Sequence, residues 1–278
     1  MDWSRTALWR MARDVKIRRI HGRVAALCEE LIRTRRSSGV HFDFQKKRDF
    51  GGKKIIWQYW AQGYDNLPQQ VGECLASVDK YAGDYTIVRL CDADVEQYID
   101  IPDFVRDKRG LMTTAHFSDL LRLILLATYG GIWMDATILL SGPIPERYLQ
   151  QDFFVFRRDD SEQSKLYWKN VYAYYFGWAK WFRVNMLSSF MSARAGGEII
   201  LDLCDLMLLW WQMHDAMPDY FFFQIMFDVY AGKTEAFPLE SDTLPHYLQQ
   251  SVKDPKFNIM SREEILTTIP IHKMTYKA

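Results

Sequence analysis

The residues best suited to chemistry lie between positions 116 and 137. His116, Asp119 and Arg122 are spaced i, i+3 and i+6 in a run of leucine and isoleucine, so they share one face of an otherwise apolar helix. Asp135 follows in an apolar segment that is typical of a buried strand, with Thr137 two positions further on. A carboxylate in such a segment is unfavourable unless it binds a partner. The pattern therefore predicts a polar site built from this helix and this strand.

Each of these features has two interpretations. Asp119 and Arg122 form either a structural ion pair that seals a helix edge or a polar stripe whose guanidinium binds phosphate or sugar hydroxyls. Asp135 and Thr137 point the same way on a strand, so this carboxylate and hydroxyl suit a divalent metal or a ribose. The alternative is a buried aspartate that caps a turn. The glycine pair between the helix and the strand favours the functional interpretation.

Alternating strands and helices must position these residues. Apolar runs predict strands over 53–59, 85–90, 132–140, 153–156 and 186–193. Helical patterns cover 1–36, 68–81, 92–99, 103–109, 114–129, 198–214 and 219–231. This alternation predicts an α/β sandwich with a mostly parallel sheet, in which ligands bind beyond the carboxyl ends of the strands. Trp57, Gln58 and Asp135 are expected at or near such ends.

Five segments carry a family resemblance. They are 54–60 (KIIWQYW), 116–122 (HFSDLLR), 129–137 (YGGIWMDAT), 219–223 (DYFFF) and 271–277 (IHKMTYK). Their order and spacing resemble the capsular polysaccharide synthesis proteins, which belong with glycosyltransferases that carry a DXD sugar-binding region. The resemblance implies a Rossmann-like α/β/α sandwich of the GT-A type and a nucleotide-sugar donor. We expect this domain to span 41–278, behind a basic helical extension over 1–40.

The resemblance also implies roles for single residues. Trp57 would lie against the nucleotide base, and Asp119 and Arg122 would hold sugar and ribose hydroxyls. His272, Lys273 and Lys277 would close over the diphosphate. The expected donor-binding set is Trp57, Gln58, Asp119, Arg122, Gly131, Asp135, Thr137, Lys273 and Lys277. Within that set Asp119, Arg122 and Asp135 are the expected catalytic residues, and the expected acceptor contacts are His214, Asp219 and Tyr220.

One position departs from the family pattern. A DXD element offers two acids that face one Mg²⁺ or Mn²⁺ on the diphosphate, but Thr137 stands in place of the second acid. Three explanations remain open. His272 or another acid completes a metal site with Asp135, lysines at 273 and 277 neutralise the diphosphate without metal, or the protein is no longer a catalyst. We expect the first explanation, a metal site formed by Asp135 and His272. The metal would be Mn²⁺ or Mg²⁺, and a histidine ligand suits Mn²⁺ better.

Charge is uneven along the chain although the total is zero. Residues 1–40 contain ten Lys/Arg and four Asp/Glu, a net charge of +6, interleaved with Trp and aliphatic side chains. Such a segment, residues 1–36, is expected either to lie on an anionic membrane surface or to pack on the domain as a solvated helix. No motif accompanies the charge, so nucleic acid is not an expected partner. The four cysteines lack metal or paired spacing, which is typical of reduced thiols in a cytoplasmic protein.

These observations predict a cytoplasmic enzyme, peripheral on the inner face of the cell membrane. We expect it to transfer a sugar from a nucleotide-sugar, a UDP-sugar by preference, to a polysaccharide or lipid-linked glycan acceptor. The family resemblance implies that the anomeric configuration is retained. The alternative is a non-catalytic carbohydrate-binding or scaffold subunit of a polysaccharide assembly complex, which Thr137 favours.

Overall fold

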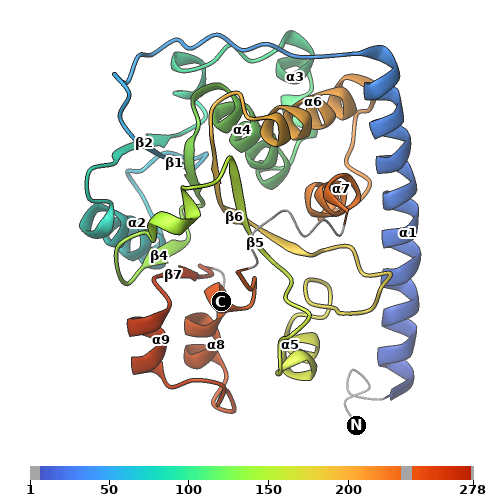
Figure 1. Cartoon of the computed structure of the whole chain (residues 1–278), viewed down its shortest axis with the longest axis vertical. Coiled ribbons are helices and arrows are strands. Elements are labelled where there is room, and N and C mark those ends of the chain that lie inside the picture. Colours follow the sequence, from blue (N-terminus) through green and yellow to red (C-terminus); the bar gives the residue numbers. More distant parts are fainter. Residues whose placement is uncertain (1–6, 233–239, 277–278) are drawn as a thin grey trace.

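A five-stranded sheet forms the centre of the molecule (Figure 1). The computed structural model describes residues 7–232 and 240–276. The strands are β1 (Ile55–Tyr59), β2 (Thr86–Leu90), β3 (Gly131–Met134), β5 (Phe153–Arg157) and β6 (Met186–Ala193), in the order β2-β1-β3-β6-β5. β1 is parallel to β2 and β3, whereas β6 is antiparallel to β3 and β5, so four of the five strands run one way. The predicted mostly parallel sheet is confirmed.

Both faces of this sheet are covered. Successive side chains of a strand point to opposite faces, so Ile55 and Trp57 belong to one core and Ile56 to another. The covering elements are α4 (Thr114–Tyr129), α6 (Glu198–Met213) and α7 (Phe222–Ala231) on the first face, and α2 (Gln69–Tyr81), β4 (Ile138–Leu140) and β7 (Ile271–Lys273) on the second. The layers form the expected α/β/α sandwich.

The single strand predicted over 132–140 is wrong, because the chain turns inside it. The backbone N–H of Asp135 donates to the Ser189 carbonyl at 2.9 Å, and that of Ile138 donates back to the Asp135 carbonyl at 2.9 Å. This turn takes the chain out of the central sheet, and β4 then pairs antiparallel with β7. Asp135 therefore lies just beyond the carboxyl end of β3 instead of in the middle of a strand. The helix predicted over 92–99 is reduced to a 3₁₀ turn, Val95–Gln97.

Helix α1 (Ala7–Ser38) packs along α6 and α7 (Figure 1). Ile17, Val24 and Leu31 on its inner face are at most 3% exposed and join the largest core. Near its end, the Arg35 guanidinium lies 2.8 Å from a carboxylate oxygen of Asp205, which is 1% exposed. The boundary predicted at residue 40 stays a prediction, but this helix shares the core of the domain that follows it.

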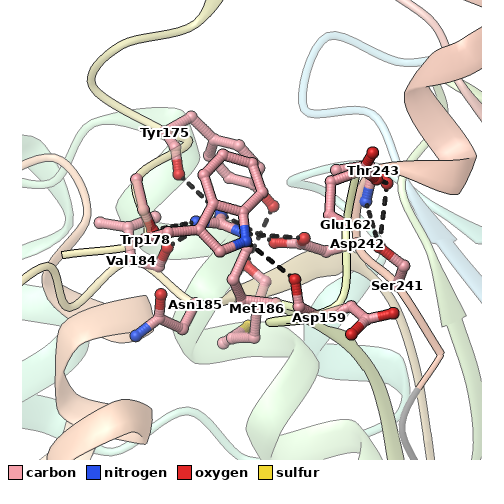
Figure 2. A network of polar contacts seen from close by, with 12 residues as sticks. Asp159, Glu162, Tyr175, Trp178, Val184, Asn185, Met186, Ser241, Asp242 and Thr243 are labelled. Atoms are coloured by element: carbon pink, nitrogen blue, oxygen red, sulfur yellow. Dashed lines mark hydrogen bonds and ion pairs between the residues drawn. The ribbon is translucent and has the colours of Figure 1, made fainter. Parts of the chain in front are cut away.

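A buried ion pair fixes the segment that leads to β7 (Figure 2). Arg158, directly after β5, donates to both carboxylate oxygens of Asp242 at 3.0 Å. The same guanidinium donates to three backbone carbonyls, those of Tyr175, Gly177 and Val184. From Asp242 the chain continues to β7, which carries Lys273 and forms part of the site.

The remaining helices of the described ranges are short. They are α3 (Asp103–Asp107), α5 (Lys165–Val171), α8 (Tyr247–Lys253) and α9 (Arg262–Thr268). Within residues 7–232 and 240–276, no helix is both long and apolar enough to cross a bilayer.

Candidate functional site

A cavity of about 710 Å³ opens at the carboxyl ends of β1 and β3. It is bounded by the residues that follow these two strands, by the first turns of α4, by α7 and by β7 with the residues after it. This is the edge of a parallel sheet at which ligands bind, and the volume suits a small-molecule site. The cavity also contains the predicted residues Asp119, Arg122, Asp135, Thr137 and Lys273.

The carboxylate of Asp135 accepts hydrogen bonds from three donors on three elements. Its Oδ1 accepts from Trp133 Nε1 at 2.9 Å and from Arg122 Nη2 at 3.2 Å. Its Oδ2 accepts from Lys273 Nζ at 3.3 Å. The same ammonium group donates to the hydroxyl of Thr137. Asp135 and Thr137 therefore face the same partner, as predicted, although a turn and not a strand aligns them.

Behind Asp135 lies a second carboxylate, on α4. Arg122 Nη1 donates to Asp119 Oδ1 at 2.6 Å, and Arg122 Nη2 donates to Ser118 Oγ at 3.2 Å. The i, i+3 spacing on the helix produces this ion pair. The pair also lines the cavity and is joined through Arg122 to Asp135, which is the position that the functional interpretation requires.

Exposure separates these four charged groups into two layers. The side chains of Asp135 and Lys273 are 26% and 25% exposed, whereas those of Arg122 and Asp119 are 4% and 11% exposed. A ligand therefore reaches Asp135 and Lys273 first, while Arg122 and Asp119 support them from behind. Two cations and two carboxylates leave the cluster formally neutral.

Burial acts differently on the pKa values of the two carboxyl groups. Burial raises the pKa of Asp135, but the cationic Lys273 and Arg122 outweigh it and hold this pKa below its ordinary value. Burial raises the pKa of Asp119 to about 6; Arg122 opposes that rise and the Asp135 charge adds to it. At neutral pH, Asp135 is thus the firmly ionised acid of the pair.

The amino terminus of α4 borders the same cavity. Thr113 caps this helix, because its side chain accepts a hydrogen bond from the His116 backbone N–H at 3.2 Å. Thr113 and Thr114 both line the cavity. The first turn of a helix presents unpaired N–H groups and a partial positive charge, which favour an anion such as phosphate.

Three expected donor contacts do not line this cavity. Trp57 is fully buried, and its Nε1 donates to the carbonyl of Gly130 at 3.0 Å. Gln58 is fully buried and accepts from Arg89 Nε at 3.1 Å. Gly131 lies at the opposite end of β3, where a Cβ would be 2.5 Å from the Ile55 carbonyl oxygen. Its positive φ of 95° and that close approach give Gly131 a role in strand pairing.

The structure does not bring His272 to Asp135. His272 is fully buried, its Nε2 is 3.0 Å from Ser141 Oγ, and burial lowers its pKa to about 4. Neighbouring residues of a strand point to opposite sides, so His272 faces away from the cavity that Lys273 lines. In the described part of the chain, no three His, Cys, Asp or Glu side chains are grouped to hold a metal ion.

Of the three expected acceptor contacts, only Tyr220 lines the cavity, where its side chain is 62% exposed. Asp219 instead accepts a hydrogen bond from the Phe221 backbone N–H at 2.8 Å, at the start of α7. His214 stacks on Trp210 with ring centroids 4.0 Å apart. Lys277 lies outside the described residues.

The cavity also contains residues that the sequence did not single out. Trp60 follows β1, and its ring meets Tyr276 edge-on with centroids 5.1 Å apart. Gln224 Nε2 on α7 donates to Ser188 Oγ on β6 at 3.0 Å, and both side chains line the cavity. Trp60 could have been found from its place directly after a strand. No local signal marks Ser188 or Gln224, which packing between distant segments brings together.

Comparisons with known proteins agree on one class. An O-glycosyltransferase from Annulohypoxylon truncatum is 32% identical over 103 residues, which are 33% of this chain and 24% of that protein. An O-glycosyltransferase from Phomopsis amygdali is 28% identical over 99 residues, 32% of this chain and 24% of that protein. The match thus spans about a quarter of the length of these relatives.

Two further matches cover most of the chain. The solved structure of PaToxG glycosyltransferase aligns with 79% of this chain and 81% of its own, at 13% identity and a TM-score of 0.38. The family described as capsular polysaccharide synthesis protein matches residues 13–278. The chain is a member of this capsular polysaccharide synthesis protein family.

Proposed function

We propose that this protein is a glycosyltransferase that moves a sugar from a nucleotide-sugar, a UDP-sugar by preference, to a polysaccharide or lipid-linked glycan. The observation that carries the proposal is the half-buried Asp135–Lys273 pair in a cavity at the carboxyl edge of a parallel sheet. Family membership and the names of both O-glycosyltransferase relatives support the same reaction class.

In this proposal each layer of the cluster has its own task. The carboxylate of Asp135 accepts hydrogen bonds from ribose or sugar hydroxyls. Lys273 and the amino terminus of α4 bind the diphosphate and stabilise the negative charge that it gains as the leaving group. Arg122 and Asp119 hold Asp135 in place through the hydrogen bond at 3.2 Å. The base lies against Trp60, because Trp57 has no face toward the cavity.

We propose that transfer retains the anomeric configuration. An inverting enzyme requires a base that takes a proton from the acceptor, and both carboxylates that line the cavity accept hydrogen bonds from Arg122. Tyr220 stands at the cavity mouth as a contact for the acceptor. NMR of the fresh product gives the configuration; an inverted product would refute retention and point to Asp119 as the base.

The test of the proposed function is release of nucleoside diphosphate from a panel of UDP- and GDP-sugars, with Asp135→Asn beside the wild type. Slow hydrolysis of one donor should be lost in this variant, whose melting should stay cooperative. Asp152→Asn is the matched control, because Asp152 pairs with Arg194 on the surface away from the cavity. Equal turnover in the wild type and in Asp135→Asn would refute the assignment.

A binding subunit without turnover is the second candidate, because Thr137 supplies a hydroxyl where the family pattern has an acid. Calorimetry with UDP separates the two. UDP binding without hydrolysis of any donor, in the presence of glycan acceptors, would favour the binding subunit.

We propose further that the protein works as a peripheral protein on the cytoplasmic face of an anionic membrane, through the predicted segment 1–36. Leu8, Met11 and Val15 share the outward face of α1 and are 78%, 65% and 50% exposed. Arg18 and Arg19 continue this face as exposed cations. Apolar and basic side chains together favour an anionic lipid surface.

The liposome test replaces these three apolar residues with serine. The variant should sediment less with vesicles that contain phosphatidylglycerol than the wild type does. Equal sedimentation of the two proteins would refute this membrane surface.

A further inference from the structure

We propose that Lys273 occupies the place of the divalent metal, so that this site binds the nucleoside diphosphate without a metal ion. The inference rests on the proposed function and deepens it. It departs from the metal site that we expected from the sequence, in which Asp135 and His272 share Mn²⁺ or Mg²⁺. The side chains that line the cavity do not supply the ligands that such an ion requires.

The cavity offers a metal ion little free negative charge. Among the described residues that line the cavity, the carboxylates are those of Asp119 and Asp135. The side chain of Asp119 is only 11% exposed and accepts a hydrogen bond from Arg122 at 2.6 Å, so this carboxylate is already engaged. Both oxygens of Asp135 already accept hydrogen bonds, Oδ1 from Trp133 and Arg122 and Oδ2 from Lys273. A divalent cation at Asp135 would therefore stand beside two fixed positive charges, which repel it.

A divalent metal at Asp135 would also need ligands from other side chains. Thr137 offers only a neutral hydroxyl, and this hydroxyl already accepts a hydrogen bond from Lys273. His272 faces away from the cavity and lies 3.0 Å from Ser141 Oγ. Hard cations such as Mg²⁺ and Mn²⁺ prefer several oxygen ligands that are anionic or carbonyl groups. The described residues at the carboxyl edge of the sheet do not bring a group of acidic ligands together.

Strand pairing holds Lys273 in position at the cavity. In the antiparallel register of β4 and β7, Ile138 pairs with Lys273, and the Met274 backbone N–H donates to the Thr137 carbonyl at 2.9 Å. These bonds fix Lys273 beside the turn that carries Asp135 and Thr137. An ammonium group has three N–H donors, and the bonds to Asp135 and Thr137 use two of them. The third is available to a diphosphate oxygen, in the same cavity as the amino terminus of α4.

The test measures the affinity for UDP and for GDP by calorimetry, in EDTA and in Mn²⁺. The wild type should bind one of them with Kd values that agree within about twofold in the two buffers. Lys273→Met should weaken binding about tenfold or more in EDTA, and Lys273→Arg should restore most of it, because the cation is what the diphosphate requires. Lys80→Met is the control, because Lys80 is exposed on α2.

Electron paramagnetic resonance of Mn²⁺ supplies a direct second readout. We expect no tightly bound Mn²⁺, with or without the nucleotide. Stoichiometric Mn²⁺ that Asp135→Asn removes, or a Kd that Mn²⁺ lowers tenfold, would overturn the inference. So would unchanged UDP and GDP binding in Lys273→Met.

The donor assay separates this inference from the proposed function. Hydrolysis of a nucleotide-sugar only in Mn²⁺ would leave the proposed function in place and refute the role of Lys273. The absence of both hydrolysis and nucleoside diphosphate binding would refute both.

Discussion

Deleting residues 1–36 should unfold the protein, although this segment was expected from its composition to be an extension. The inner face of α1 inserts Ile17, Val24 and Leu31 into the largest core, where they lie against α6 and α7. Arg35, lost with the same deletion, is the partner of the buried carboxylate of Asp205.

The magnitude follows from burial. Each of the three aliphatic side chains contributes about 1.5–3 kcal/mol when it is fully buried, so together they contribute about 4.5–9 kcal/mol. His41 Nδ1 lies 3.0 Å from the Asp205 carboxylate and stays in the truncated protein, so the loss of Arg35 adds less than the roughly 3–5 kcal/mol of a buried charge left unpaired. The sum is comparable to the whole free energy of unfolding of an ordinary domain, about 5–15 kcal/mol.

Urea unfolding followed by far-ultraviolet circular dichroism is the assay. The truncated protein should show no cooperative transition or one at a much lower urea concentration. The control carries serine at Leu8, Met11 and Val15 on the outward face and should keep a midpoint close to that of the wild type. A truncated protein that unfolds cooperatively at the wild-type midpoint would refute the claim that α1 belongs to the domain.

Three further predictions concern stability. Gly131→Ala should lower the melting temperature by several degrees, because its Cβ would lie 2.5 Å from a β1 carbonyl oxygen at a φ of 95°; an unchanged melting temperature would contradict this. Arg158→Met should cost about 3–5 kcal/mol in urea unfolding, because Asp242 would stay buried without its cation; a loss below 1 kcal/mol would show that the pair is dispensable. Burial lowers the pKa values of His21 and His272 to about 4, whereas a histidine of the unfolded chain has a pKa of about 6.5. Below pH 6.5 the unfolded chain therefore binds more protons than the folded protein does. The contribution of these two histidines to stability is complete above pH 6.5 and is lost toward pH 4, by about 2 kcal/mol each at pH 5; a urea midpoint that does not fall between pH 7 and pH 5 would oppose this.

The sequence predicted the elements whose patterns are local. Helical periodicity predicted α4, and apolar runs predicted the strands of the sheet. The i, i+3 spacing placed Asp119 beside Arg122. Asp135 and Thr137 face the same way as expected, although a turn and not a strand aligns them. These features depend on neighbours within one segment, which a single sequence contains.

The sequence failed where several segments meet. The family resemblance implied that Trp57 lies against the base, but the strand directs its side chain into the core. Trp60, beyond the strand end, lines the cavity instead. His272 and Lys273 were both assigned to the diphosphate, although alternation along a strand allows only one of them to face it. Ser188 and Gln224 reach the cavity from β6 and α7, and only the packed fold brings them together.

A crystal structure with UDP bound tests the central claim most directly, because that claim states where the diphosphate binds. We predict the diphosphate within hydrogen-bonding distance of Lys273 Nζ, the uracil against Trp60, and no metal ion between the phosphates and Asp135. UDP bound elsewhere on the protein would contradict the assigned site. UDP held at Asp135 through a metal ion would keep the site and contradict the role given to Lys273.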